Sequence, residues 1–504
     1  MATRKPILSA CKLSHLSPYA QHLALLSTAV CMFTACTPQA EQAEQAEQAE
    51  QTSQVEQDMI RAQGGEPPLE LDAEPPPEPY CRSLDSAWRA HYQGDPLDEA
   101  LASQIEERGL EGDPQVYVNA EGRCVRRELP SIHEPIAQLG RALFFSKELS
   151  GDRDVSCATC HHPLLGGGDA LSVSVGPVHF DPTREDAMGA DRVRGLTDPS
   201  ALQVGRNAPT TFNIAFWDRG LFWDARVESL SAELAPNGEN TPLATPESSS
   251  PLSPDPLAGE NLTVAQARFP LVERHEMAGS WADLYEGDPE GLRAALSARL
   301  ATSPEWLERF EALCASTEHQ RGLPQSWREA CALPEGTERQ EALTHSSHVV
   351  FAIGEYERSQ VFTDTPWRRY VQGERDALTL NEKKGAQLFF TPRVEGGLGC
   401  ADCHAGDLFS DERPHAVGTP QIGPGKGAGE LGLGDLGRAG VSGLERDAHR
   451  FRTPTLLNVE VTAPYFHSGA YGSLRKAIEH YDHQHGRVLE YFGDQNKSDT
   501  NTRP

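Results

Sequence analysis

Two pentapeptides carry the residue types in this chain that are best suited to bind a redox cofactor. Each has two cysteines separated by two residues and followed at once by histidine. They read Cys157-Ala-Thr-Cys160-His161 and Cys400-Ala-Asp-Cys403-His404. Two thiols one helical turn apart can each bond one vinyl group of a single haem, and the next imidazole can then ligate the iron. The spacing therefore predicts two covalently bound c-type haems, with His161 and His404 as iron ligands.

Two other kinds of chemistry are open to cysteine pairs of this type. Four cysteines can hold zinc, and a single pair can act as a redox-active dithiol. The two pairs lie far apart in the sequence, and neither alternative requires a histidine directly after each pair. Both observations favour haem.

The N-terminal segment points to export. Residues 1–36 hold basic side chains, then a mostly apolar run too short to span a membrane, then small residues before Cys36. This order is typical of a secretory signal peptide. The small residues also resemble a bacterial lipoprotein box, so a lipid anchor at Cys36 and plain secretion are alternatives. The expected location is the periplasm or cell envelope.

Four further cysteines fit an oxidising compartment. Cys314 and Cys331 form the natural local pair, which leaves Cys81 to pair with Cys124. Four cysteines allow three connectivities, and buried free thiols are the alternative.

Length and charge divide the chain and exclude some functions. The 504 residues suffice for two or three domains, and the net charge of −29 excludes a general nucleic-acid binder. An acidic surface suits docking of a small basic protein. Residues 37–80 are rich in Ala, Glu, Gln and Pro and are expected to form a disordered linker. The boundary between two folded domains, 81–372 and 373–504, is expected near residue 372.

The folded part has the pattern of a mainly α protein with long loops. Alternating strand patterns are scarce, and residues 237–262 have the composition of a surface insertion. Helical spacing of apolar residues recurs in several segments. The helices are expected at Pro96–Arg108, His133–Phe145, Pro289–Ala301, Pro304–Cys314, Val349–Val361, Asn381–Phe390 and Leu474–Tyr481.

Several strings besides the pentapeptides resemble those of the bacterial di-haem cytochrome c peroxidases and the related MauG-type enzymes, over roughly residues 130–490. The strings are Arg206-Asn-Ala-Pro-Thr-Thr-Phe-Asn213, Leu221-Phe-Trp-Asp-Ala-Arg226, Phe269-Pro-Leu-Val-Glu-Arg-His-Glu-Met277, Phe451-Arg-Thr-Pro-Thr-Leu-Leu-Asn458 and Thr462-Ala-Pro-Tyr-Phe-His-Ser-Gly469. The resemblance implies two cytochrome c-like haem domains. Residues 81–372 would hold the peroxide-reactive haem and residues 373–504 the electron-transfer haem.

The resemblance also implies roles for individual residues. Trp223 matches the tryptophan that relays electrons between the haems, and Glu276 matches the carboxylate above the peroxide-binding haem. Glu233, ten residues after Trp223, stands where the family usually has glutamine. Trp223 as a core side chain and the two glutamates as solvated surface charges are the alternatives.

A calcium site is implied at the interface of the family's two domains. Asn207 and the carbonyl groups of Thr462 and Pro464 match its oxygen ligands, which suit calcium. The alternative for Asn207 is a capping or turn residue.

The resemblance also implies candidates for the sixth ligands of the two irons. His179 is the nearest candidate to block the first iron, and a surface histidine is its alternative. The chain has no methionine after Met277, so the methionine that ligates the second haem in the peroxidases is absent. Tyr481 stands at that position, as a tyrosine does in the MauG-type enzymes. Core packing of Tyr481, with His480 or His483 as the ligand, is the alternative.

These features favour an exported di-haem peroxidase that reduces hydrogen peroxide, with electrons relayed from the second haem to the first. The expected donor is a small redox protein, a cytochrome c or cupredoxin. One alternative is a MauG-like oxidase that modifies residues of a partner protein through high-valent iron. Another is a non-catalytic electron-transfer cytochrome. The resemblance also allows a homodimer.

Overall fold

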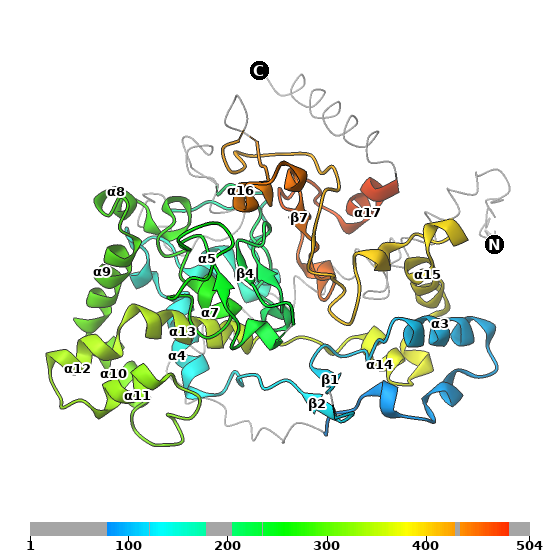
Figure 1. Cartoon of the computed structure of the whole chain (residues 1–504), viewed down its shortest axis with the longest axis horizontal. Helices are drawn as coiled ribbons and strands as arrows, with labels where there is room; N and C mark the ends of the chain where they lie inside the picture. Colours follow the sequence, from blue (N-terminus) through cyan, green and yellow to red (C-terminus); the bar gives the residue numbers. More distant parts are fainter. Residues whose placement is uncertain (1–77, 120, 178–203, 234, 429–433, 483–504) are drawn as a thin grey trace, which may run out of the picture. The chain divides into compact units, whose positions relative to one another are not determined.

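Helices dominate the structure, a computed structural model that describes residues 78–119, 121–177, 204–233, 235–428 and 434–482 (Figure 1). The predicted signal peptide, most of the acidic linker, His179 and His483 lie outside these ranges. None of the helices within them is long and apolar enough to cross a membrane. The mainly α class with few, short strands is confirmed for the described residues.

The helices and strands follow the sequence patterns closely. The helices are α3 (Pro96–Glu107), α4 (Pro135–Phe145), α5 (Cys157–Cys160), α7 (Leu262–Ala267), α8 (Trp281–Leu284), α9 (Pro289–Ala301), α10 (Pro304–Ala312), α11 (Gln325–Ala332), α12 (Thr337–Leu343), α13 (Ser346–Arg358), α14 (Pro366–Val371), α15 (Leu380–Phe390), α16 (Ala439–Ser442) and α17 (Leu474–Asp482). The strands are β1 (Val116–Val118), β2 (Cys124–Arg126), β3 (Gly220–Leu221), β4 (Val227–Ser229), β5 (Leu243–Ala244), β6 (Pro414–His415) and β7 (Phe451–Arg452). They form three small antiparallel sheets, β1–β2, β3–β4–β5 and β6–β7. All seven predicted helices are present.

The chain divides into two compact units, which we describe separately. The smaller unit combines residues 86–107 with 365–400, and the larger holds 79–85, 108–364 and the described residues from 401 onward. The boundary predicted near residue 372 falls inside the smaller unit, directly after α14.

A buried aspartate organises the smaller unit. Asp98 on α3 accepts a hydrogen bond from the Tyr370 hydroxyl at 2.8 Å and forms ion pairs with Arg375 and Lys383 at 2.7 and 2.9 Å. These partners hold the pKa of Asp98 below its usual value against the cost of its burial. The aspartate therefore ties α3 to α14 and α15.

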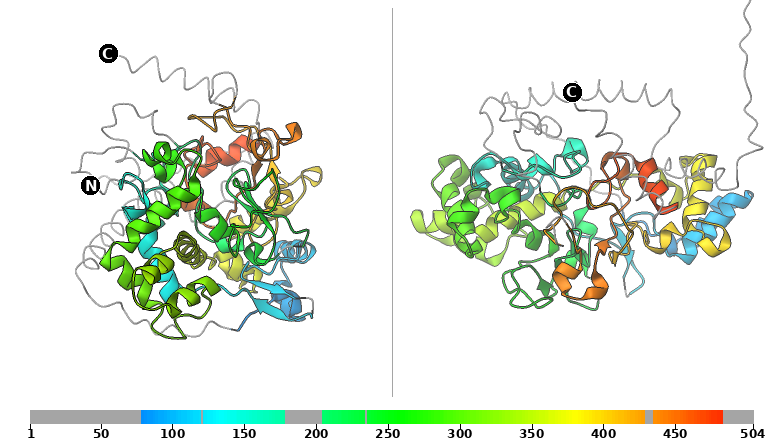
Figure 2. Two further views of the ribbon diagram at one scale, coloured as in Figure 1. Left: turned by 60° about the vertical axis from the view of Figure 1, so that its left-hand side comes forward. Right: turned by 90° about the horizontal axis from the view of Figure 1, so that it is seen from above.

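The larger unit is built on α13, which packs against α4 and α7 (Figures 1 and 2). The predicted buried face of α4 lies in this core, with Ile136, Leu139, Leu143 and Phe144 each at most 6% exposed. The two helices touch closely at Gly140, where an added Cβ would lie 1.8 Å from the carbonyl oxygen of Ala352. A side chain at this position would force α4 away from α13.

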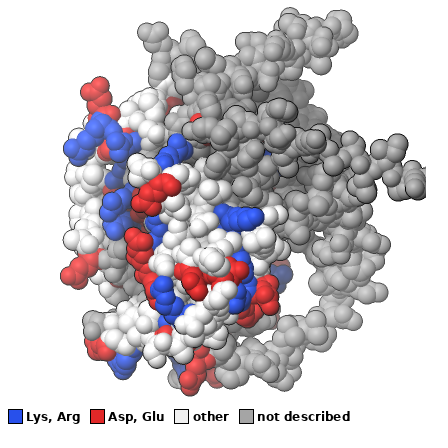
Figure 3. All heavy atoms as spheres, turned by 90° about the vertical axis from the view of Figure 1, so that its right-hand side faces the viewer, with Lys and Arg blue, Asp and Glu red and all other residues white. Residues whose placement is uncertain are grey.

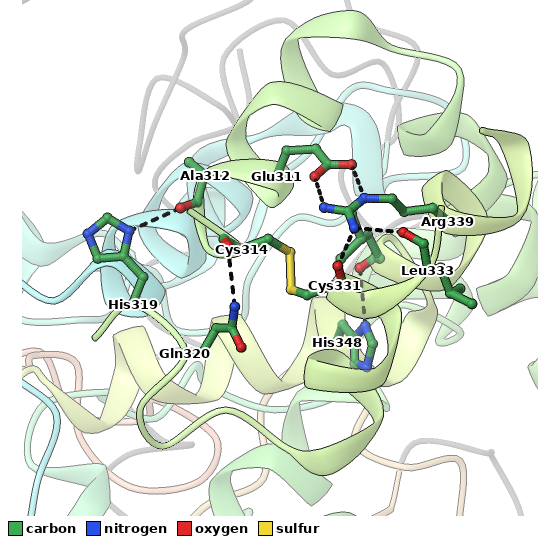
Figure 4. Close-up of a disulfide and its surroundings, with 10 residues drawn as sticks. Glu311, Ala312, Cys314, His319, Gln320, Cys331, Leu333, Arg339 and His348 are labelled. Atoms are coloured by element: carbon green, nitrogen blue, oxygen red, sulfur yellow. Dashed lines mark hydrogen bonds and ion pairs between the residues drawn. A yellow bond between two sulfur atoms is a disulfide. The ribbon is translucent and has the colours of Figure 1, made fainter. Parts of the chain in front are cut away.

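The helices α8 to α12 extend this core and carry a disulfide between Cys314 and Cys331 (Figure 4). Arg339 braces the disulfide, because its guanidinium pairs with Glu311 and donates to the carbonyl oxygens of Cys331 and Leu333. The second disulfide joins Cys81 to Cys124. Both predicted pairings are confirmed.

The segment 237–262, expected as a surface insertion, is packed onto the larger unit. Arg268 and Arg293 are both buried, and both bind Glu247 at 2.6 to 2.7 Å. Arg268 also binds Asp255 at 2.7 Å. The insertion is therefore held by buried ion pairs next to α7.

Candidate functional site

A cavity in the larger unit is lined by the first pentapeptide. Its empty volume is about 1170 Å³, including space open to solvent, and Cys157, Cys160 and His161 all lie on its wall. Pockets for cofactors and other organic ligands commonly measure about 300–1,000 Å³. The cavity is thus large enough for an organic cofactor at the residues that would attach one.

The local structure places the two thiols at the spacing that attachment of one haem requires. Cys157 and Cys160 are the first and last residues of the short helix α5, so they stand one turn apart. The helix is fixed at its start by a capping box, in which the backbone N–H of Ser156 donates to the Thr159 hydroxyl at 2.9 Å. Neither cysteine is in a disulfide.

The adjoining histidine is prepared to ligate a metal. His161 Nδ1 lies 3.2 Å from the carbonyl oxygen of Gly167, to which it donates, so Nε2 keeps its lone pair. Burial lowers the pKa of His161, which keeps the imidazole neutral, as ligation requires. These residues fit a haem attached through Cys157 and Cys160.

The second pentapeptide shows the same arrangement. Its cysteines are also free of disulfides, and a single 3₁₀ turn, Cys400–Asp402, begins it. His404 Nδ1 lies 3.0 Å from the carbonyl oxygen of Phe409, and burial lowers the pKa of His404 as well. The donor set therefore fits a second haem.

A carboxylate and an amide face the first cavity from adjacent segments. Glu276 lies on a π-helical turn, Arg274–Ala278, and lines the cavity together with Gln266 at the end of α7. Burial raises the pKa of Glu276, although the Arg226 guanidinium, 4.0 Å away, opposes this shift. The site thus holds a carboxyl group whose pKa lies above its usual value and which can take up and release a proton.

Glu233 does not take part in this arrangement. It is exposed and is not among the residues that line the cavity. Gln266, ten residues before Glu276, occupies the cavity wall instead. The role of Glu233 stays a prediction, and the insertion lies between it and the segment that carries both Gln266 and Glu276.

Trp223 is buried on the cavity wall in a rigid setting. Its indole N–H donates to the carbonyl oxygen of Asn207 at 2.9 Å. The neighbouring Arg206 binds Asp224 at 2.6 Å and Asp435 at 2.7 Å, all three being buried. This network fixes the position of the tryptophan relative to the cavity.

The comparisons with known proteins agree with this geometry. Residues 134–376 match the family model described as di-haem cytochrome c peroxidase. The predicted resemblance is thereby confirmed: the chain is similar to the di-haem cytochrome c peroxidases and to MauG. Methylamine utilization protein MauG of Methylorubrum extorquens is 27% identical over 352 residues, covering 70% of this chain and 69% of that protein. Cytochrome c551 peroxidase of Pseudomonas aeruginosa is 27% identical over 400 residues, covering 79% of this chain and 81% of that protein.

A solved structure also resembles this chain. It is that of a MauG-like protein associated with microbial copper homeostasis, with a TM-score of 0.43 and 22% identity. The match covers 70% of this chain and 79% of that one.

Asn207, one of the calcium ligands implied by the family pattern, contacts the C-terminal segment. Its backbone N–H donates to the carbonyl oxygen of His467, three residues after Pro464, at 2.8 Å. The Asn207 amide N–H₂ donates to the carbonyl oxygen of Leu171 at 2.8 Å. Calcium at this point stays a prediction.

Tyr481 lies on α17, with its ring 5.8 Å from that of Phe466. The rival ligand His480 is fully buried, and both of its ring nitrogens are engaged. Nδ1 lies 3.1 Å from the Tyr471 hydroxyl, and Nε2 lies 2.7 Å from the carbonyl oxygen of Val417. Ligation of the second iron by Tyr481, with His480 as its rival, stays a prediction.

Glu357 is a second carboxyl group on the cavity wall, and we expect it to make the free energy of unfolding depend on pH. Burial raises the pKa of Glu357, on α13, from 4.5 to about 8, and its Oε2 has no hydrogen-bond partner within the described ranges. As the pH rises from about 4.5 to 8, the unfolded chain loses a proton that the folded chain retains, so the free energy of unfolding falls. We expect Glu357→Gln to abolish this part of the decline.

Denaturant unfolding of the purified protein between pH 4 and 9 measures the effect. The variant should match the wild type near pH 4 and become progressively more stable than it toward pH 8. Glu341→Gln, which removes an exposed carboxyl group on α12, is the control and should follow the wild type. Parallel curves for Glu357→Gln and the wild type would contradict the expectation.

Proposed function

We propose that this enzyme of the di-haem peroxidase family reduces hydrogen peroxide to water. Electrons would come from a small redox protein and pass through the second haem to the first. The observation that carries the proposal is the single cavity that combines the attachment cysteines, His161 and the carboxyl group of Glu276. When bound, haem iron supplies the two-electron redox chemistry that peroxide cleavage requires.

The side chains of the cavity would handle the protons. One peroxide takes up two electrons and two protons to give two waters. The Glu276 carboxylate accepts the proton of one peroxide oxygen and returns it to the other, which then leaves as water. Burial raises its pKa, which makes it a stronger base for this exchange. The Gln266 amide, on the same wall, can hydrogen-bond to the peroxide and orient it.

Trp223 is the proposed electron relay. It is buried on the cavity wall and is held by its N–H bond to Asn207. A fixed, buried indole keeps a constant position for electron transfer and is shielded from side reactions with water.

The composition of the second half supports another activity, a MauG-like oxidase that modifies residues of a partner protein. No methionine follows Met277, so none can ligate the second haem from that half, and Tyr481 is the proposed ligand. An anionic phenolate lowers the potential of its iron and makes it a poor acceptor from an ordinary cytochrome. It would instead favour the storage of oxidising equivalents. A non-catalytic electron-transfer cytochrome is the third candidate.

We further propose a periplasmic or cell-envelope location, with the Cys36 lipid anchor as an alternative to secretion. Two disulfides support an oxidising compartment. The net charge of −29 favours a basic redox partner. On the face shown in Figure 3, acidic and basic side chains are interspersed, so we do not assign the docking surface to that face.

Mixing the ferric protein with hydrogen peroxide separates the three activities. Rapid oxidation of a reduced small cytochrome or cupredoxin, with stoichiometric loss of peroxide, supports the peroxidase. A long-lived spectrum of the protein oxidised by two electrons, with slow donor turnover, supports the MauG-like oxidase. An unchanged spectrum in both the ferric and the partly reduced state would contradict both and leave electron transfer alone.

A further inference from the structure

Arg452, on strand β7, is a buried cation in the first cavity. Its side chain lines the cavity, and the residue is only 5% exposed. Its Nε donates to the carbonyl oxygen of Phe222 at 3.0 Å, and its guanidinium carbon lies 3.4 Å from the centre of the Trp217 ring. These contacts fix the guanidinium in place, but both partners are uncharged.

No carboxylate in the described ranges contacts this charge directly, although Glu412 and Asp224 lie near enough to favour it electrostatically. Arg452 forms no ion pair within 4.0 Å there, and its buried Nη1 has no hydrogen-bond partner. Burial lowers the pKa of Arg452 to about 10, which still leaves the group charged at neutral pH. A buried charge with an unsatisfied donor is costly unless an anion pairs with it.

The other charges around the cavity are already matched or leave it positive. Arg206 is bound by Asp224 and Asp435, and Arg226 also contacts Asp224 at 3.3 Å. Lys426 adds a further positive charge to the wall. Of the two acidic side chains of the wall, Glu276 already lies 4.0 Å from the Arg226 guanidinium, and burial raises the pKa of Glu357 to about 8, which favours its neutral form. A cavity inside an acidic protein is therefore prepared for an anion at Arg452.

We propose that Arg452 binds a carboxylate of the cavity's occupant, and that this carboxylate is a propionate of the porphyrin attached at Cys157 and Cys160. The inference rests on haem attachment in this cavity, as the proposed function does, but not on peroxide turnover. A guanidinium offers a planar pair of N–H groups that matches a carboxylate. Stacking on Trp217 holds that plane and reduces the entropy lost on binding. The same chemistry could also bind a free carboxylate from solution.

The test compares holoprotein variants Arg452→Gln and Arg452→Lys with Arg450→Gln. Arg450 is exposed and lies two residues away, so its variant removes the same charge outside the cavity. Haem content by the pyridine haemochrome method is measured first for each. Resonance Raman spectroscopy then reports the propionate bending modes, and spectroelectrochemistry reports the midpoint potential of each haem.

For Arg452→Gln we expect a shifted propionate mode and a more negative midpoint potential of one haem, because a nearby cation favours the reduced iron. Arg452→Lys retains the charge but not the paired donors, so it should shift the mode with a smaller change in potential. Arg450→Gln should match the wild type in both. Wild-type modes and potentials in both Arg452 variants would overturn the proposal. If Arg452→Gln does not acquire its haems, the propionate mode of Arg452→Lys decides between the two outcomes.

A titration with sodium acetate distinguishes the two sources of carboxylate. The wild-type absorption spectrum should not respond, since the porphyrin's own carboxylate fills the site. A saturable response in the wild type that is lost in the Arg452 variants would show a free carboxylate at Arg452 and overturn the propionate assignment. If the wild type does not turn over peroxide but the Raman spectra of the variants shift as expected, the proposed function is contradicted and the propionate assignment stands.

Discussion

Replacing Glu276 by glutamine lowers kcat/KM for hydrogen peroxide by about 10²- to 10⁴-fold, the usual contribution of a general acid–base group. The amide preserves the size of the side chain but cannot carry a proton between the two peroxide oxygens. Haem content should stay at two per chain, because the residue lies on the cavity wall and away from the attachment cysteines in sequence. Steady-state oxidation of a reduced donor protein measures the effect.

Glu233→Gln is the matched control for this experiment. It makes the same chemical change at an exposed glutamate outside the cavity lining, so its kcat/KM should equal that of the wild type. Equal loss in both variants would show that the effect is not specific to the cavity. Full activity in Glu276→Gln would remove this carboxyl group from the proposed mechanism.

Replacing Tyr481 by phenylalanine changes the ferric spectrum of one of the two haems and raises its midpoint potential. The reason is that an anionic oxygen ligand stabilises ferric iron, and phenylalanine cannot supply one. Electron paramagnetic resonance of the ferric protein, with spectroelectrochemistry, measures both changes.

Tyr465→Phe is the control, because it removes a hydroxyl group that donates to the carbonyl oxygen of Val459 at 3.1 Å. Its spectrum should equal that of the wild type. If the Tyr481→Phe spectrum is also unchanged, Tyr481 is not a ligand, and the argument for a MauG-like oxidase loses its main support.

The parts of the structure that depend on local sequence could be predicted. The cysteines of α5 stand one turn apart because two residues separate them, and His161 must follow directly. The face of α4 follows from the spacing of its apolar residues. Both disulfides followed from separating the haem cysteines and signal cysteines from the remaining four.

The cavity wall could not be predicted in full, because it depends on how distant segments pack. Counting ten residues forward from Trp223 leads to Glu233, whereas counting ten back from Glu276 leads to Gln266. The insertion lies between the two, and only its packing through Arg268 and Arg293 shows which residue reaches the cavity.

The charge of Arg452 illustrates the same limit. Arg452 lies in a segment that resembles a family motif, and arginine side chains are most often paired or exposed. The sequence therefore gives no sign of a buried cation here. That Arg452 is buried, stacks on Trp217 and forms no direct ion pair with the part of the chain described depends on side chains more than 200 residues away in sequence. Such a feature follows only from the tertiary structure.

We expect a porphyrin to be bound through thioether links at each pentapeptide, with the first in the described cavity. Proteolysis of the mature protein followed by mass spectrometry tests this directly. We expect one haem on the peptide with Cys157 and Cys160 and one on the peptide with Cys400 and Cys403. Unmodified, alkylatable thiols on either peptide, from a host that attaches c-type haem, would contradict the account.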